Sequence, residues 1–569
     1  MPHVLTDDDR TPRILTTHVG LSAGTPATVL VATATPGSTV SGRLRGPDGR
    51  TVDLVPAVAE TTHGWSVGPH ARLALPVDLA PGTWTLEVDD AHGTDAVEIP
   101  VAPDLLQRAV LPDVLAYFRG QRSTGEIDRK DRAARLWGDE SGRTVDARGG
   151  WLDASGDTSK FLSHLTYTTA MSPQQTPLCV WAFMAARDEL VRRHPGVVRA
   201  VGTRLRDEAL WGADFLVRFQ APEGYFYVGI FDALTKQLDE RIINAPIQDC
   251  GRTDRYQAGY RHGGGLAIAA LARASTLDDD GDLTRAEYLE AARRGFEHLE
   301  EHNLAYLWDG RENALDDTCA LLAAAELVAA GVEEARPAAE RRARALVARY
   351  VRPTTGPGWF DLDGTGAPFF HAAEPGLPVV ALLRAADVLG GSLAEGARTT
   401  AVAAMSDVLD RAAGVPNPFG YPRQRTQPLG GDERDAFFFP HTNETGYWWQ
   451  GENAGISSLA TAALLAADHA DPRLRARLRA FASDQVGWVL GRNPFDVCML
   501  QGRGRGVVEY ESDFPNAPGG IVNGITSGWE DEDDIAFLPP EAPAGDSWRW
   551  SEQWIPHTAW YALAVATLT

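Results

Sequence analysis

The chain has 569 residues, of which 44% are hydrophobic and 23% charged, and its formal net charge at pH 7 is −24. This length exceeds what one hydrophobic core usually supports, so we expect two domains. The acidic surface would repel nucleic-acid phosphates and anionic lipid, which favours a neutral or cationic partner. No apolar run reaches the ~18 residues needed to span a membrane. The first residues show no secretion signal, so we expect a cytoplasmic protein.

The cysteines lie far apart in the sequence and form no CxxC pair. Their spacing indicates neither a zinc site nor a disulfide framework, and we expect buried free thiols. An acidic run at 278–282 resembles a calcium loop, but its glycine is misplaced and the bidentate acid is missing. We therefore expect no metal and no cofactor. The four cysteines are Cys179, Cys250, Cys319 and Cys498.

Residues 1–104 differ from the rest of the chain in their pattern. Runs rich in β-branched and other apolar residues are separated by Gly/Pro turns, which predicts a small β-sandwich. A junction is expected near Pro103 and Asp104. The predicted strands lie at 27–33, 39–44, 72–77 and 84–88.

From residue 105 onward, apolar residues recur at three- and four-residue spacing in about twelve segments, which predicts helices. Long Gly/Pro-rich loops join them, and long loops in a compact domain are usually functional. Twelve sequential helices favour an all-α (α/α)6 toroid with a loop-built cleft, and no parallel sheet after residue 110. The segments are 109–122, 174–193, 200–219, 263–276, 284–302, 316–330, 336–350, 376–390, 395–413, 447–468, 472–490 and 553–568.

Asp153 and Asp157 follow Trp151 in a stretch rich in Gly and Ser, residues 149–160. Small residues let backbone and substrate approach closely. Two acids four residues apart could hold one water, one taking its proton while the other orients it. The alternative is a polar loop whose aspartates cap the next helix, and the bare spacing favours it.

Near the start of the last predicted helix, Glu552 stands among three tryptophans, Trp548, Trp550 and Trp554. Indole faces are good platforms for sugar rings. A carboxyl group pressed against indoles has a raised pKa and can donate a proton near neutral pH. An exposed acid at the start of an amphipathic helix is an equally weighted alternative.

Tyr447, Trp448 and Glu452 open another predicted helix, with His441 before it. Such a cluster suits recognition of sugar hydroxyls, whereas its alternative is core aromatics with an N-terminal acid. Three weaker clusters precede or begin helices, and each alone is more often structural. They are His371 with Glu374, Arg255 with Arg261 and His262, and Asp316 with Asp317.

Together these segments resemble glycoside hydrolase family 9 over nearly the whole chain. The resemblance implies an immunoglobulin-like β-sandwich at 1–104 and an (α/α)6 catalytic domain at 105–569. It also implies that Asp157 is the general base, with Asp153 beside it, and that Glu552 is the general acid. The matching segments are 16–20, 82–88, 117–122, the GGWLDASGD signature at 149–157, 211–216, the LGRNPF motif at 490–495, and Ser551-Glu552.

The sequence departs from the usual pattern of that family at three places. The aspartate signature carries one extra residue, Ser551 stands in place of Asn, and the His-His-Arg element after Asn493-Pro494 is absent. The variant signature, together with Ser163-His164, 173–175 and 448–453, resembles the exo-acting branch that releases glucosamine from chitosan oligosaccharides.

We therefore expect an inverting hydrolase that acts on short β-linked oligosaccharides, an exo-β-glucosaminidase, with carboxyl groups of Asp157 and Glu552 roughly 6.5–9.5 Å apart. A β-glucosidase or endoglucanase on cello-oligosaccharides is one alternative, and a non-catalytic carbohydrate-binding protein is another. The oligomeric state stays open, a homodimer included. The expected substrate-binding residues are Trp151, His164, Arg255, His371, Glu374, Tyr447, Trp448, Glu452 and Trp550.

Overall fold

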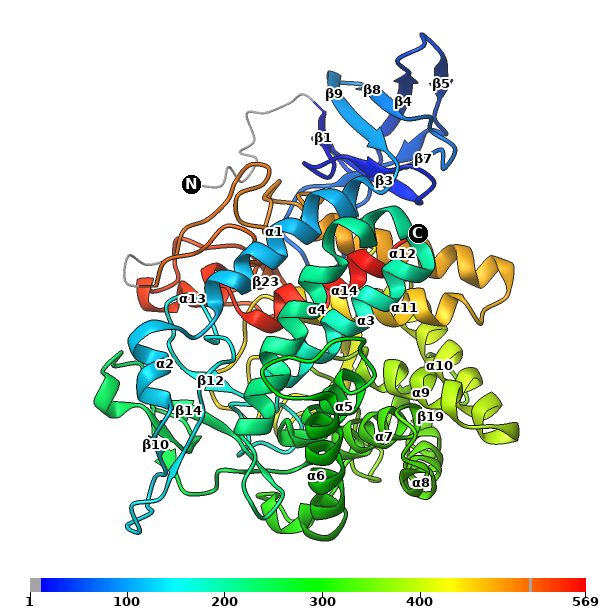
Figure 1. Ribbon diagram of the computed structural model, residues 1–569. Helices are drawn as coiled ribbons and strands as arrows, with labels where there is room; N and C mark the ends of the chain where they lie inside the picture. Colours follow the sequence, from blue (N-terminus) through cyan, green and yellow to red (C-terminus); the bar gives the residue numbers. More distant parts are fainter. Residues whose placement is uncertain (1–11, 511–513) are drawn as a thin grey trace.

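The computed structural model describes residues 12–510 and 514–569 (Figure 1). Strands dominate up to β9 (Gly93–Ala102), and long helices follow from α1 (Leu105–Gln121). In Figure 1 the N-terminal strands, β1 to β9, gather at one end of the molecule, beside α1 and α12 (Pro472–Val489). No described helix is both long and apolar enough to cross a membrane.

The N-terminal strands form two sheets over one apolar core. Alternate residues of β4 point into that core: Val40 and Leu44 are buried, whereas Arg43 is exposed, the period-two pattern of a half-buried strand. Pairing is antiparallel except between β2 and β9. One sheet has the order β1 (Arg13–Leu15), β3 (Ala27–Ala32), β7 (His70–Leu75). The other has the order β2 (Leu21–Ser22), β9, β8 (Gly82–Asp90), β4 (Thr39–Arg45), β5 (Thr51–Asp53), with β6 (Ala57–Val58) on β4.

Six helices contact one another in a closed ring, in the order α3, α5, α7, α9, α11, α14 and back to α3. These helices are Ala- and Leu-rich and buried almost all round, as expected of a layer covered on both sides. They are α3 (Thr176–Arg193), α5 (Gly264–Ala274), α7 (Ala314–Ala329), α9 (Leu377–Val388), α11 (Asn453–Ala467) and α14 (Ile555–Thr567).

A second helix packs against each member of this ring from outside, and each outer helix buries only part of its surface. The pairs are α4 on α3, α6 on α5, α8 on α7, α10 on α9, α12 on α11, and α1 on α14. The remaining outer helices are α4 (Pro195–Arg218), α6 (Arg285–Tyr306), α8 (Arg336–Ala348) and α10 (Gly391–Ala412).

The helix expected at 447–468 begins only at Asn453, so this boundary was wrong. The side chain of Thr445 accepts the backbone N–H groups of Tyr447 and Trp448, and Asn443 accepts that of Thr445. Such local bonds compete with a helix. Two short helices, α2 (Gly125–Asp131) and α13 (Trp548–Ser551), were not expected. The described sheets after residue 110 are small and antiparallel, as predicted.

Polar contacts and one buried aromatic side chain, Trp65, fix the β-rich region to the helical region. We call this side chain the Trp65 plug. The backbone N–H of His18 donates to the carbonyl of Leu490 at 2.8 Å, and its Nε2 lies 2.8 Å from Asp496 Oδ1. Arg72 pairs with Asp484 of α12 at 2.6 Å. The end of α12 and the residues that follow it, including Leu490 of the LGRNPF motif, therefore contact the β-rich region. The Trp65 indole packs against Phe419, Tyr421, Phe437, Phe438 and Trp488.

Replacing Trp65 with alanine should lower the free energy of unfolding by about 3–5 kcal/mol, the usual cost of removing a buried aromatic side chain. Thermal unfolding followed by circular dichroism measures this. Val55→Ala is the control, because Val55 is 85% exposed in the same region. Equal melting temperatures for the two variants would show that the plug contributes nothing to stability.

Candidate active site

One cleft of about 810 Å³ collects residues from five separate parts of the chain. The three acids expected to be catalytic, Asp153, Asp157 and Glu552, all line it. Its other lining residues are Ala154, Phe161, His164, Tyr167, Phe231, Leu234, Pro246, Ile247, Gln248, Asp249, Cys250, Gly446, Tyr447, Trp448, Gln450, Tyr510, Phe514, Gly545, Asp546, Trp548, Arg549 and Trp554.

Trp151 anchors the aspartate loop, residues 149–160, on the side away from the cleft. Its indole N–H donates to Glu208 Oε2 at 3.2 Å, and Arg122 holds both oxygens of the same carboxylate. The ring fits against α4 only because residue 212 is glycine, where a Cβ would come within 2.5 Å of it. Trp211 donates to the carbonyl of Gly150 at 2.9 Å. These contacts fix the start of the loop, and Trp151 does not line the cleft.

Asp153 is buried at the base of the cleft, where both its oxygens accept hydrogen bonds. Gln175 Nε2 donates to Oδ1, and the indole N–H of Trp554 donates to Oδ2 at 3.2 Å. Burial raises the pKa of Asp153 well above its usual range, and the charges of Asp157 and Glu552 raise it further.

Asp157 follows after a tight turn and accepts the backbone N–H of Ser159 at 2.8 Å. Behind the turn, Lys160 is fully buried and pairs with Asp131 at 2.7 Å, while Arg241 holds both oxygens of Asp131. Burial raises the pKa of Asp157, against the opposing effect of the Ser159 hydrogen bonds. No helix begins directly after either aspartate, so the helix-cap alternative does not hold.

Glu552 lies in the gap between α13 and α14, where it is half-buried and lines the same cleft. Its backbone carbonyl accepts the N–H of Asn523 at 2.7 Å, and its Oε2 accepts from Asn523 Nδ2 at 3.4 Å. Burial raises the pKa of Glu552 to about 8, and the charge of Asp157 adds to this shift. A carboxyl group with that pKa is protonated at neutral pH and can donate its proton.

Three of the expected substrate-binding residues line the cleft: His164, Tyr447 and Trp448. Burial lowers the pKa of His164 to about 4, so its ring is neutral at pH 7. Its Nδ1 lies 3.0 Å from Gln175 Oε1, and Gln175 in turn donates to Asp153. Gln175 therefore connects the histidine to the acid.

The other six expected binding residues lie outside the lining. His371 and Glu374 are fully buried at the start of α9, where Glu374 accepts the N–H of Gln174 at 3.1 Å. Arg255 stacks over Trp308, its guanidinium 4.4 Å from the ring centre. The six residues are Trp151, Arg255, His371, Glu374, Glu452 and Trp550.

Glu452 and Trp550 stand directly behind cleft residues. Glu452 is 2% exposed and accepts the backbone N–H of Phe439 at 3.0 Å. Trp550 is fully buried against Trp449 and Trp529. Each lies two residues along the chain from a residue that does line the cleft, Gln450 and Glu552 respectively.

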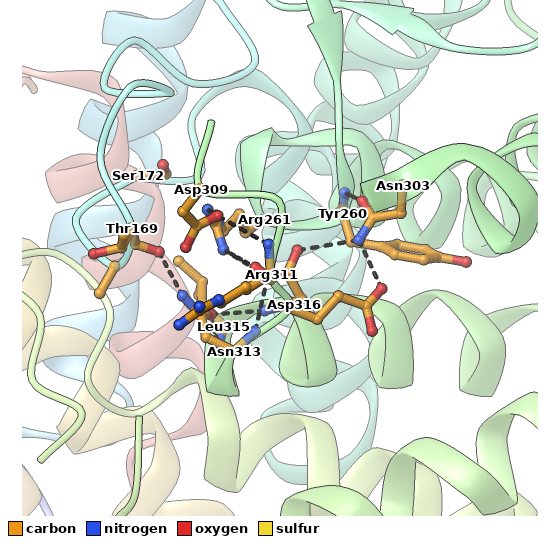
Figure 2. Close-up of polar contacts among 12 residues, drawn as sticks. Thr169, Ser172, Tyr260, Arg261, Asn303, Asp309, Arg311, Asn313, Leu315 and Asp316 are labelled. Carbon is orange, nitrogen blue, oxygen red and sulfur yellow. Dashed lines mark hydrogen bonds and ion pairs between the residues drawn. The ribbon is translucent and has the colours of Figure 1, made fainter. Parts of the chain in front are cut away.

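The cluster that contains Arg261 and Asp316 is a buried ion network at the start of α7 (Figure 2). Arg261 pairs with Asp309 at 2.7 Å and with Asp316 at 3.0 Å. Asp316 and Asn313 form the capping box of that helix. Asn313 also donates to the carbonyl of Thr169, so the network supports the loop that carries His164 and Tyr167.

Several lining residues were not expected from the sequence. Gln248 and Asp249 lie on an exposed loop, and Cys250 beside them is exposed. The expectation of buried thiols was therefore wrong for Cys250, because its loop forms the cleft wall rather than a helix. The residues of the acidic run 278–282 do not gather around a metal position: Asp279, Asp280 and Asp282 pair with arginines.

Known proteins share this sequence pattern and fold. The model of the family "Glycosyl hydrolase family 9" matches residues 108–510. "Endoglucanase 23" of Oryza sativa subsp. japonica is 30% identical over 213 residues, which is 36% of this chain and 37% of that protein. The structure titled "Bacteroides ovatus GH9" superposes with a TM-score of 0.65 at 16% identity, covering 98% of both chains. A metagenome-derived family 9 endoglucanase superposes with a TM-score of 0.63 at 18% identity, covering 98% and 99%. The chain thus belongs to glycosyl hydrolase family 9, with the fold of a glycoside hydrolase.

Proposed function

We propose that the protein hydrolyses a β-glycosidic bond with inversion. Glu552 donates a proton to the leaving oxygen, Asp157 takes a proton from the attacking water, and Asp153 holds that water. The observation that carries this proposal is the gathering of three carboxyl groups in one cleft, one of them with a pKa of about 8. Two carboxyl groups of different acidity are what inverting hydrolysis needs.

The aromatic residues of the cleft support a sugar substrate. Trp448, Trp548 and Trp554 line it together with Tyr447, and indole faces pack well against the apolar faces of sugar rings. Trp554 also donates to Asp153, so one side chain both shapes the floor and fixes an acid. The partner is therefore a small oligosaccharide.

We further propose that the sugar is an amino sugar, as in chitosan oligomers. Five carboxyl groups line the cleft among the described residues, against one guanidinium, Arg549, which pairs with Asp546 at 3.0 Å. Asp249 is exposed and forms no ion pair with any other residue in 12–510 or 514–569. It is our candidate acceptor for the ammonium group, whereas Glu452, which the sequence suggested as a substrate-binding residue, is buried outside the lining.

Contacts between loops support exo action. Gln248 and the Tyr167 hydroxyl both donate to the carbonyl of Thr445. The neighbouring Glu444 accepts the backbone N–H groups of residues 169–171. Hydrogen bonds thus join three segments of the cleft wall, around residues 167–171, 248 and 444–445. Such a connected wall is what we expect where a cleft is closed beyond the terminal sugar.

We also propose a two-domain organisation, an N-terminal sandwich followed by a helical toroid. The closed ring of six helices and its outer partners support an (α/α)6 toroid. The two N-terminal sheets support an immunoglobulin-like sandwich. We place the division between the two domains at residues 104 and 105, between β9 and α1.

An endoglucanase or β-glucosidase acting on cello-oligosaccharides is the second candidate. The rice relative is named an endoglucanase, and so is a solved structure with the same fold. The two candidates differ in the charge of the sugar and in the length of chain that the cleft admits.

The test is a panel of chitosan and cellulose oligomers, with Asp249→Asn beside the wild type. We expect glucosamine released one unit at a time, faster than glucose from cellobiose. Because exposed ion pairs contribute about 0–1 kcal/mol, Asp249→Asn should raise KM for amino sugars a few-fold and leave glucose substrates unchanged. Asp254→Asn removes the same charge outside the cleft and is the control. Faster cleavage of cellobiose, or early loss of polymer viscosity, would favour the second candidate.

The raised pKa of Glu552 also predicts how stability depends on pH. Between the ordinary value of 4.5 and about 8, the folded protein keeps a proton that the unfolded chain has released. Stability therefore falls as pH rises through this window. Glu552→Gln removes this effect, so its melting temperature should exceed that of the wild type at pH 9 and match it near pH 4. Glu60→Gln, at an exposed position, is the control. An equal difference in melting temperature between Glu552→Gln and wild type at both pH values would contradict a raised pKa of Glu552.

A further inference from the structure

Behind Glu552 a chain of hydrogen bonds runs from a backbone amide to the carboxyl group. The N–H of Ala454 donates to His557 Nδ1 at 2.7 Å, and His557 Nε2 lies 2.8 Å from Asn523 Oδ1. Asn523 Nδ2 donates to Glu552 Oε2 at 3.4 Å. All of these side chains except that of Glu552 are at most 1% exposed.

The first hydrogen bond of this series fixes which groups donate and which accept in the others. A backbone N–H can only donate, so Nδ1 of His557 must be the acceptor and the ring proton must be on Nε2. Burial lowers the pKa of His557 to about 3, which keeps the ring neutral across the working range. His557 Nε2 therefore donates to Asn523 Oδ1.

The orientation of the Asn523 amide follows from the same argument. Its oxygen receives the histidine proton, so its NH2 group faces the opposite way, toward the carbonyl of Trp548 at 2.7 Å, Gln450 Oε1 at 3.1 Å and Glu552 Oε2 at 3.4 Å. Its two N–H donors are shared among these three acceptors. A flipped amide would place two oxygens against each other. The backbone is held as well, because Gly524 donates to the carbonyl of Trp550 at 2.9 Å.

This donor matters most when Glu552 becomes charged. A hydrogen bond to a carboxylate is shorter and roughly twice as strong as one to a neutral acid. A contact of 3.4 Å to the protonated acid can tighten as the proton leaves, which stabilises the product of the acid step more than its starting state. The bond to Oε2 also favours placing the acid proton on Oε1.

We propose that Asn523, held in one orientation by His557, is a positioning residue that sets the side-chain geometry of Glu552 and stabilises the carboxylate formed when Glu552 protonates the leaving oxygen. The inference rests on the proposed role of Glu552 as proton donor. His557 acts through Asn523, and its ring tautomer is imposed by the first turn of α11.

The test compares an oligosaccharide, whose leaving group needs a proton, with a p-nitrophenyl glycoside, whose leaving group needs little. Asn523→Ala should lower kcat on the oligosaccharide by about tenfold, the worth of one hydrogen bond to a charged group, and change kcat on the aryl glycoside far less. Because the lost hydrogen bond favoured the carboxylate, the alkaline limb of kcat/KM should move to higher pH.

His557 provides a second pair of variants should Asn523→Ala fail to fold. His557→Leu removes the donor to Asn523 and should reproduce the Asn523→Ala pattern, whereas His557→Gln keeps an N–H donor and should recover part of the activity. Thr558→Ala is the matched control, because it removes a buried hydrogen bond from Ile521 in the same turn of α14. That variant should lower stability without changing the ratio of the two rates.

Glu552→Gln, measured on the same two substrates, separates the two claims. If it slows both substrates equally, the proposed role of Glu552 fails and the inference fails with it. If Glu552→Gln spares the aryl glycoside but Asn523→Ala slows both equally with an unmoved alkaline limb, only the positioning role is overturned. Equal activity of His557→Leu and His557→Gln would also overturn it.

Discussion

Three partly or fully buried carboxyl groups in one cleft cannot all be ionised at neutral pH without a large cost, because burial and mutual repulsion both disfavour the charged forms. Burial is the main cause of the raised pKa of Asp153, Asp157 and Glu552, and their charges act on one another. The fold must hold these groups together against that repulsion. Much of the structure around the cleft can be understood as the means of doing so.

Each acid is held by a different device. Gln175 and Trp554 bind Asp153, the backbone of Ser159 binds Asp157, and Asn523 binds Glu552. Behind the aspartates, the buried charges of Asp131, Lys160 and Arg241 compensate one another, and breaking such a group by removing one member is strongly destabilising. The positions of the acids thus depend in part on side chains that lie outside the cleft lining, such as Gln175, Asn523 and Lys160.

Periodicity located the twelve long helices, because an apolar stripe on a helix leaves a clear pattern in sequence. It misplaced the start of α11, since the side-chain bonds of Asn443 and Thr445 are local and leave no periodic signal. Short α13 was missed for a related reason: a single turn shows no period.

For the site, motifs and resemblance pointed to the acids of the cleft, but residue type alone could not separate lining from support. Trp151 and Trp550 look like sugar platforms in sequence, yet their rings are buried. Glu452 and Gln450 are two residues apart, and only the turn of the backbone decides which one faces the cleft. Asn523 and His557 carry no motif, and their link to Glu552 arises from three segments brought together by folding.

In the proposed reaction, Asp157 activates a water while Glu552 protonates the leaving oxygen from the opposite side of the bond. The most direct measurement is proton NMR of the first product formed from a β-linked oligosaccharide, recorded before the anomers equilibrate. We expect the α anomer to appear first, since one displacement by water inverts the anomeric centre. A β anomer formed first would contradict it, because retention needs a covalent intermediate and a carboxylate close enough to form one.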